Sequence, residues 1–157
     1  MTVQDMMRRS PRSCPPSLNL AAVTELLWSC GCGALPVVDA RKNVLGIITD
    51  RDICVALGTR DRRPSELTAE QAMSRKVAIC KSTDEIHTAL EIMKKRKVRR
   101  VPVVGNTGQL EGVLCLSDLI LQARHDDGSD PELSYEDVMG TLKVIYWHHS
   151  ILMVPVC

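Results

Sequence analysis

Apolar residues follow two spacings along this chain, one typical of amphipathic helices and one typical of short buried strands. Two helical stripes place apolar residues at i, i+3, i+4 and i+7: Val23, Leu26, Leu27 and Cys30, then Ile86, Ala89, Leu90 and Met93,. After each stripe come a Pro-Val-Val strand, turn residues and a second apolar strand, close enough in sequence for a hairpin,. The pattern therefore predicts helix, strand, strand twice in one chain.

Each second strand runs directly into a polar segment at the start of another predicted helix. In the first set this segment is Gly46-Ile-Ile-Thr-Asp-Arg-Asp52, which presents Thr49, Asp50, Arg51 and Asp52. In the second set it is Gly112-Val-Leu-Cys-Leu-Ser-Asp118, which presents Cys115, Ser117 and Asp118. A helix start next to a hydroxyl and an arginine is a suitable place for a phosphorylated ligand.

The two sets form an internal repeat with a constant offset of 66 residues and no gap. Matched positions include Met7 and Met73, Cys14 and Cys80, Pro36-Val37-Val38 and Pro102-Val103-Val104, Gly46 and Gly112, and Asp52 and Asp118. With a short strand at Cys14 or Cys80, each copy reads strand, helix, strand, strand, helix, which predicts an α+β fold. The expected division is a first unit at 1–60, a linker at 61–67, a second unit at 68–124, and a loop, helix and tail at 125–157. A unit of about 60 residues buries too little surface to be comfortable alone, so the two units are expected to pack together as a pair.

Polar residues also predict where other helices begin. Ser82 with Glu85, and Ser134 with Asp137, have the spacing of a capping box,. The second pair is expected to start a last helix with an apolar stripe at Val138, Leu142 and Ile145, after a loop at 125–131. The apolar segment 151–157 is either a strand that pairs with another chain or disordered.

Composition excludes several classes of function. The 157 residues are 45% hydrophobic, with 20 basic and 19 acidic side chains, so net charge gives no reason to bind nucleic acid or an anionic membrane,. Aromatic residues make up 3%, too few for a single-strand stacking platform,. No membrane span or secretory signal is visible, and seven scattered cysteines favour thiols over a disulfide framework, which predicts a cytoplasmic protein,.

The repeat, the order of elements and the Gly-apolar-apolar-Thr-x-x-Asp pattern together make residues 1–122 resemble a tandem pair of cystathionine-β-synthase (CBS) domains of the small stand-alone bacterial type. The resemblance implies a pseudo-two-fold pair with ligand clefts between the units and a homodimer shaped as a flat disc. It also implies an adenosyl ligand, of the AMP, ADP or ATP type, or S-adenosylmethionine or NAD. Such a protein is a regulatory sensor that signals to a partner, which the sequence does not name.

Each candidate residue of the first copy has a functional and a structural interpretation. Asp52 either accepts hydrogen bonds from the two hydroxyls of a ribose, as the resemblance implies, or complements the helix dipole. Thr49 either caps the helix or contacts a phosphate, and Gly46 either admits a close backbone or ligand or is a turn residue. Arg51 either reaches a phosphate or is an exposed helix charge.

The second copy departs from the pattern because Cys115 replaces the hydroxyl residue. A thiol is a weaker hydrogen-bonding group, so Asp118 stays available for a ribose while the phosphate contact depends on Ser117. We therefore expect one good site and not two equal ones.

Six positive charges lie between Lys94 and Arg100, where the first copy has none. These charges either stabilise the C-terminal end of a helix by interacting with its dipole, or they belong to a ligand site. In the second case Arg99 or Arg100 neutralises a phosphate beside Thr49 and Asp52, in a cleft between the copies. This composite pocket is the most specific hypothesis that the sequence supports.

No constellation of catalytic residues is recognisable, so an enzyme is not expected. The motif Cys30-Gly-Cys32, the pair at 148–149 and Cys157 match no standard zinc spacing, so no metal site is expected,. The alternative to a sensor is a structural or dimerisation scaffold that binds no ligand.

Overall fold

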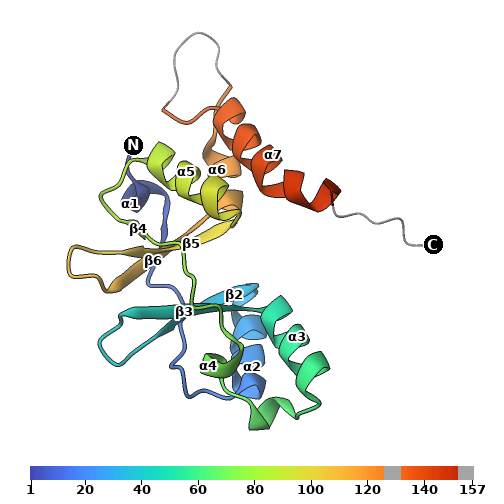
Figure 1. The fold of residues 1–157 in the computed structure, drawn as a ribbon. Coiled ribbons are helices and arrows are strands. Elements are labelled where there is room, and N and C mark those ends of the chain that lie inside the picture. The colour runs from blue at the N-terminus through green and yellow to red at the C-terminus, as the bar shows by residue number, and fades with distance from the viewer. Residues whose placement is uncertain (126–131, 152–157) are drawn as a thin grey trace. The chain divides into compact units, whose positions relative to one another are not determined.

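The computed structural model describes residues 1–125 and 132–151, and it confirms an α+β fold (Figure 1). The helices are α1 (Val3–Met6), α2 (Leu20–Cys30), α3 (Asp50–Arg60), α4 (Ala69–Ala72), α5 (Ile86–Arg96), α6 (Leu116–Gln122) and α7 (Tyr135–Ile151), with a 3-10 turn η1 (Pro64–Glu66). The strands are β1 (Arg8–Arg9), β2 (Ala34–Val38), β3 (Val44–Thr49), β4 (Cys80–Lys81), β5 (Arg100–Val104) and β6 (Leu110–Cys115). Both copies thus contain the predicted helix, hairpin and second helix.

The two predicted helical stripes are buried where the periodicity placed them. In α2 the buried residues are Leu20, Val23 and Leu27. In α5 they are Ile86, Ala89, Leu90 and Met93. Both helices end at a left-handed residue, at positions related by the repeat: Gly31 with φ 59° and Lys97 with φ 53°. The two copies therefore share helix ends as well as helix faces.

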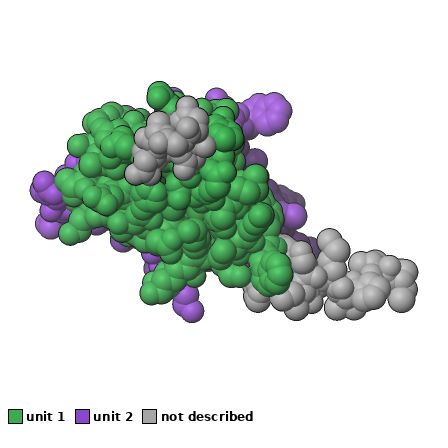
Figure 2. Space-filling view, turned by 90° about the horizontal axis from the view of Figure 1, so that it is seen from above, with its two compact units in different colours: residues 1–9, 78–105, 112–157 green, residues 10–77, 106–111 purple. Residues whose placement is uncertain are grey.

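The chain folds into two compact units that are not continuous in sequence (Figure 2). Unit 1 contains residues 1–9, 78–105 and 112–157, and unit 2 contains residues 10–77 and 106–111. The start of each repeat therefore packs with the body of the other one. The division at 1–60 and 68–124 describes the repeats in sequence, and it does not coincide with the compact units. The segment 61–67 is also part of unit 2, where Leu67 is buried and its carbonyl accepts a hydrogen bond from the Leu20 amide at 2.9 Å.

Backbone pairing explains this exchange. In unit 1, β1 pairs antiparallel with β6, with Arg8 opposite Val113. In unit 2, the matching residue Ser74 forms an antiparallel bridge with Ile47 of β3, through amide-to-carbonyl distances of 3.1 and 2.9 Å. Each pairing satisfies backbone groups that a strand edge would otherwise leave open.

The glycine of each binding segment is required by the same exchange. A Cβ on Gly46 would overlap the Met73 sulfur and lie 2.9 Å from the Ser74 carbonyl oxygen. A Cβ on Gly112 would overlap the Met7 sulfur and lie 3.0 Å from the Arg8 carbonyl oxygen. Gly46 therefore lies inside β3 and admits a neighbouring backbone, which is one of the two interpretations of this residue that the sequence left open.

Unit 1 contains a four-stranded sheet in the order β1-β6-β5-β4, with β4 parallel to β5. The helices α5 and α6 pack against this sheet, and α7 packs against both helices (Figure 1). Unit 2 contains the antiparallel hairpin β2-β3, with a bulge between Val37 and Val38, and the helices α2 and α3. Each unit encloses its own hydrophobic core.

The predicted last helix is confirmed, and one predicted cap is wrong. Asp137 accepts hydrogen bonds from the Ser134 amide and hydroxyl at 2.9 and 2.7 Å at the start of α7. The expected box of Ser82 and Glu85 does not form, because Glu85 is the N-cap of α5 and its side chain makes no capping bond. Most of the expected loop at 125–131, and the tail at 152–157, lie outside the described residues. Within the described chain, no helix combines the length and apolarity that a bilayer crossing requires.

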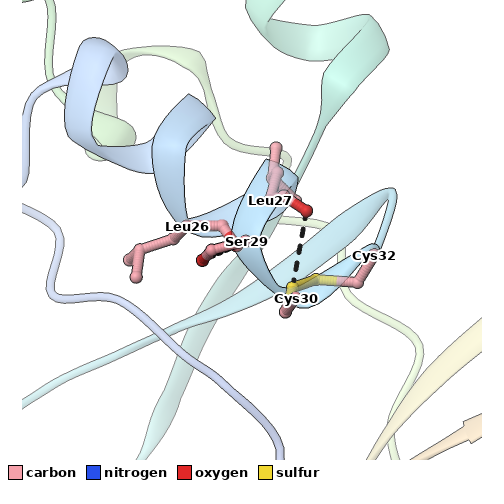
Figure 3. Close-up of a disulfide and its surroundings, with 5 residues drawn as sticks. All are labelled: Leu26, Leu27, Ser29, Cys30 and Cys32. Atoms are coloured by element: carbon pink, nitrogen blue, oxygen red, sulfur yellow. Dashed lines mark hydrogen bonds between the residues drawn. A yellow bond between two sulfur atoms is a disulfide. The ribbon is translucent and has the colours of Figure 1, made fainter.

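One pair of cysteines does not form the free thiols that the sequence predicted. Cys30, the last residue of α2, and Cys32, just beyond it, form a disulfide (Figure 3). The scattered spacing of the cysteines did not predict this bond, because Cys30 and Cys32 are separated by a single residue, Gly31. Cys14, Cys54, Cys80 and Cys115 are free thiols.

Candidate functional site

Thr49 and Asp52 form a reciprocal cap at the start of α3. The Thr49 hydroxyl accepts a hydrogen bond from the Asp52 amide at 3.1 Å, and it donates to Asp52 Oδ2 at 2.7 Å. The Thr49 amide donates to the same carboxylate oxygen at 2.8 Å. Both residues are half-buried. The other oxygen, Oδ1, receives no hydrogen bond from any residue that the structure describes, so its acceptor capacity is intact,.

The same box occurs at helices that carry no candidate site. Asp5 accepts from the Thr2 amide and hydroxyl at 2.8 and 2.7 Å, and Asp137 does the same for Ser134. The contact between Thr49 and Asp52 is therefore a helix cap in its own right, worth about 0.5–2 kcal/mol. It is compatible with ligand binding and does not demonstrate it.

Asp118, which matches Asp52 in the second copy, is occupied by Arg8. The Arg8 guanidinium donates from Nε to Oδ2 at 2.8 Å and from Nη2 to Oδ1 at 2.6 Å, so both carboxylate oxygens are engaged. This hydrogen bond with Asp118 also raises the pKa of Arg8 above its usual range. In unit 2 the residue at the place of Arg8 is Ser74, whose side chain is too short for such a pair. The two matched aspartates therefore differ in what they offer a ligand.

Four predicted residues lie together in unit 1. They border a pocket of about 180 Å³ that is lined by Arg99, Arg100, Cys115, Leu116, Ser117, Ile120, Leu142 and Tyr146. Arg99 Nη1 donates to the Tyr146 hydroxyl of α7 at 2.8 Å, and the guanidinium carbon lies 5.8 Å from the centre of the Tyr146 ring. Two cations and two hydroxyls around so small a volume suit one anionic group rather than a whole nucleotide, since small-molecule pockets usually have about 300–1,000 Å³.

The thiol of Cys115 does not replace the hydroxyl of Thr49. Cys115 is the N-cap of α6, and its side chain makes no capping bond. Burial raises the pKa of the Cys115 thiol, and the Asp118 carboxylate acts in the same direction, while Arg100 and Arg8 act against it. The thiol therefore stays protonated at neutral pH, where it is the weaker hydrogen-bonding group that the sequence indicated,.

The remaining predicted residues lie apart from these contacts. Arg51 is exposed, and no carboxylate of the described chain pairs with its guanidinium. Asp50 is also exposed and lines a different pocket of unit 2. The predicted combination of Thr49 and Asp52 with Arg99 or Arg100 joins residues of different units, and it stays a prediction.

Arg8 and Tyr146 are the residues that the sequence did not identify. The mismatch between Arg8 and Ser74 in an otherwise regular repeat was a usable signal for the first. Tyr146 follows Leu142 by four positions on the last helix, so it lies on the face of the predicted stripe. Among the described residues, no group of three or more His, Cys, Asp or Glu side chains is placed to hold a metal ion. The side chains at 148–149 and Cys157 lie outside the described part.

Comparison with known proteins identifies the family. The CBS domain model matches residues 3–59 and 69–124, so the chain belongs to the CBS domain family and carries two such domains.

Related proteins share these domains at modest identity. An uncharacterised protein of Methanopyrus kandleri is 25% identical over 120 residues, which make up 76% of this chain and 61% of that protein. An uncharacterised 17.7 kDa protein of Acidianus ambivalens is 31% identical over 104 residues, 66% of this chain and 62% of that protein. The chain thus spans less than two thirds of the length of either relative. Inosine-5'-monophosphate dehydrogenase of Haemophilus influenzae is 32% identical over 105 residues, 66% of this chain but only 20% of that enzyme.

Solved structures agree on the fold. Hypoxic response protein I, solved with two coordinated zinc ions, has a TM-score of 0.73 at 24% identity and covers 79% of this chain and 100% of its own. The CBS domain pair of protein MJ0100, in complex with 5'-methylthioadenosine and S-adenosylmethionine, has a TM-score of 0.70 at 24% identity over 78% of this chain and 94% of its own. CBSX2 in complex with AMP has a TM-score of 0.67 at 23% identity over 77% and 94%. At these identities the likeness concerns the fold.

Proposed function

We propose that this chain is a regulatory sensor that binds an adenosyl compound and signals through a change of conformation to a partner. Two proteins of the same fold support the ligand class, since one is in complex with S-adenosylmethionine and 5'-methylthioadenosine and another with AMP. Ligand binding changes the conformation only if the ligand has different affinities for two states of the protein.

The observation that carries the proposal is the difference between Asp52 and Asp118. A carboxylate binds a ribose by accepting from two adjacent hydroxyls, which requires an oxygen without a strong internal donor. Asp52 has such an oxygen, whereas both oxygens of Asp118 accept from Arg8. We therefore assign ribose binding to Asp52 and expect Asp118 to contribute little in the wild type.

Arg99 and Arg100 are assigned to the anionic part of the ligand. They border the pocket of about 180 Å³ with Ser117, and Arg99 is held by the hydroxyl of Tyr146. Guanidinium groups bind phosphate through charge-assisted hydrogen bonds, which are about twice as strong as neutral ones. The assignment predicts that these arginines favour phosphorylated ligands over adenosine.

The test is a thermal-shift and calorimetric panel of AMP, ADP, ATP, NAD and S-adenosylmethionine. A ligand at 100 times its Kd adds about 2.7 kcal/mol to the free energy of unfolding. Asp52→Ala is expected to abolish that gain and also to lower stability, because it removes the cap of α3. Asp5→Ala is the matched control, since Asp5 accepts from the Thr2 amide and hydroxyl in the same Thr-x-x-Asp box at α1, where no ligand contact is assigned. Binding retained in Asp52→Ala at wild-type affinity would show that Asp52 is only a cap.

The arginines are tested by the choice of ligand. Arg99→Ala and Arg100→Ala are each expected to weaken AMP on the order of tenfold, and adenosine much less, because only AMP carries the anion. Equal weakening of both ligands would contradict the assignment of the pocket to a phosphate.

A scaffold without a ligand is the second candidate, because the box of Thr49 and Asp52 also occurs at α1 and α7. It predicts that Asp52→Ala lowers the melting temperature while no adenosyl compound raises that of the wild type. Homodimerisation and signalling to a regulated partner stay predictions, and no particular partner is predicted.

A further inference from the structure

The disulfide between Cys30 and Cys32 lies where α2 ends and the chain turns toward β2 (Figure 3). Cys30 is exposed, whereas Cys32 is half-buried and packs against the hydrophobic core of unit 2. Neither residue has a part in the proposed binding of an adenosyl compound. One sulfur of the bond is therefore accessible to a thiol in solution, while the other is anchored in the protein.

Structural support explains little of this bond. A disulfide stabilises a fold mainly by closing a loop of the unfolded chain, and the gain grows with the number of residues in the loop. Here the loop contains a single residue, Gly31, so the gain is small. Exposed disulfides are more easily reduced than buried structural ones, and they are the labile, regulatory or catalytic ones. The position of the bond thus favours exchange with other thiols.

The backbone holds the two cysteines together without the bond. Gly31 adopts the left-handed conformation with φ 59°, and its amide donates to the carbonyls of Leu27 and Trp28. The Cys32 amide donates to the Leu27 carbonyl at 3.1 Å,. The Cα atoms of Cys30 and Cys32, 5.3 Å apart, are therefore positioned by hydrogen bonds that do not involve sulfur. Reduction can open the bond while the end of α2 stays in place.

The reduced form also has a hydrogen-bond acceptor in position. Cys30 Sγ lies 3.6 Å from the carbonyl oxygen of Leu27, one of the last carbonyls of α2 (Figure 3),. A thiol at this position donates to that oxygen, whereas a disulfide sulfur has no proton to donate. The fold therefore accommodates the disulfide and the two thiols alike.

We propose that Cys30 and Cys32 form a redox-active pair that exchanges electrons with low-molecular-mass monothiols, of which glutathione is the probe. The thiolate of one reagent molecule attacks the exposed Cys30 sulfur, which forms a mixed disulfide and releases Cys32 as a thiolate. A second thiolate attacks the reagent sulfur of the mixed disulfide, which releases Cys30 and forms the disulfide of the reagent. Each released cysteine takes up the proton that one reagent thiol lost, so two electrons pass to the protein. The inference does not depend on the adenosyl ligand.

The test is a redox titration of the full chain with Cys54→Ser and Cys157→Ser, which removes the exposed thiol of α3 and the last residue's thiol from the count. The protein is equilibrated without denaturant in buffers of reduced and oxidised glutathione and quenched with acid. It is then unfolded, labelled with a maleimide and weighed by mass spectrometry. The label count is expected to rise by two in one step as reduced glutathione increases, and to return when oxidised glutathione is restored.

Two single substitutions in the same background locate the attacked sulfur. Cys32→Ser leaves the exposed Cys30, so oxidised glutathione is expected to form a lasting adduct that no neighbouring cysteine resolves. Cys30→Ser leaves the half-buried Cys32, and its adduct is expected to form on the order of tenfold more slowly because access to the sulfur is restricted.

The double variant Cys30→Ser with Cys32→Ser separates exchange from structural support. It is expected to keep the circular dichroism spectrum of the wild type and to lose only a few degrees of melting temperature, because the closed loop is so short.

Three results would overturn the proposal. One is a pair that stays oxidised in every glutathione buffer and is reduced only in denaturant, which is the behaviour of a structural disulfide. Another is full labelling of the chain before any reductant is added, since no bond would then exist. The third is equal rates of adduct formation in Cys30→Ser and Cys32→Ser, which would contradict attack at Cys30.

Discussion

Gly46→Ala tests the exchange of segments between the two repeats. The new methyl group would overlap the Met73 sulfur and approach the Ser74 carbonyl oxygen at 2.9 Å, a backbone atom fixed by its bridge to β3. Overpacking of this kind costs roughly 1–3 kcal/mol, and the loss of glycine freedom in the unfolded chain returns about 0.4–1 kcal/mol. The net expectation is a free energy of unfolding lower by about 1–2 kcal/mol.

Gly58→Ala is the matched control, because a Cβ at this position of α3 meets nothing within 4 Å. It is expected to stabilise the protein by about 0.5–1 kcal/mol, the usual gain when alanine replaces glycine in a helix. Gly112→Ala should behave like Gly46→Ala, since it meets Met7 and the Arg8 carbonyl in the same way.

Differential scanning calorimetry of the three variants measures the contrast. In a protein of this size a change of 1 kcal/mol moves Tm by about 2–4 °C, so Gly46→Ala and Gly58→Ala should differ by roughly 3–12 °C. Equal shifts in the same direction would refute the reasoning, because Met73 and Ser74 would then not lie against β3.

Two further predictions concern Arg8 and the thiols. Arg8→Ser gives the first repeat the residue of the second one and frees both oxygens of Asp118, and because the guanidinium is largely exposed the free energy of unfolding falls by only about 0.5–1 kcal/mol. Titration calorimetry should then show that the number of adenosyl ligands bound per chain rises from one to two. An unchanged stoichiometry would count against a latent site at Asp118. At pH 8 a thiol reagent should modify the exposed Cys54 quickly and Cys14 and Cys80 only on unfolding, because burial raises their pKa to about 11 and about 12. The stability that the two buried thiols contribute is complete below pH 9 and is lost as the pH rises toward 11, because the thiols ionise first in the unfolded chain. Equal labelling rates of Cys54, Cys14 and Cys80 in native buffer would contradict the predicted selectivity.

The sequence by itself determined the repeat and its elements. Helical spacing located α2 and α5 because a buried stripe must recur every turn, and Pro-Val-Val located β2 and β5 because these strands are buried on both faces. The start of α3 followed from local chemistry as well, since Thr49 and Asp52 are three residues apart and need no tertiary contact to form their box. The matching positions of the two copies also identified the family.

Only the tertiary structure decided which candidate residues meet. Arg8 and Asp118 are 110 residues apart, and their pairing depends on β1 joining β6, which periodicity does not encode. The partner of Arg99 lies 47 residues further on, on a helix outside the repeat. That same helix packs against α5 and α6 of unit 1. Long-range pairings of this kind depend on how strands and helices pack, so the sequence predicted that the two copies differ at Cys115, and the packing added the difference between Asp52 and Asp118.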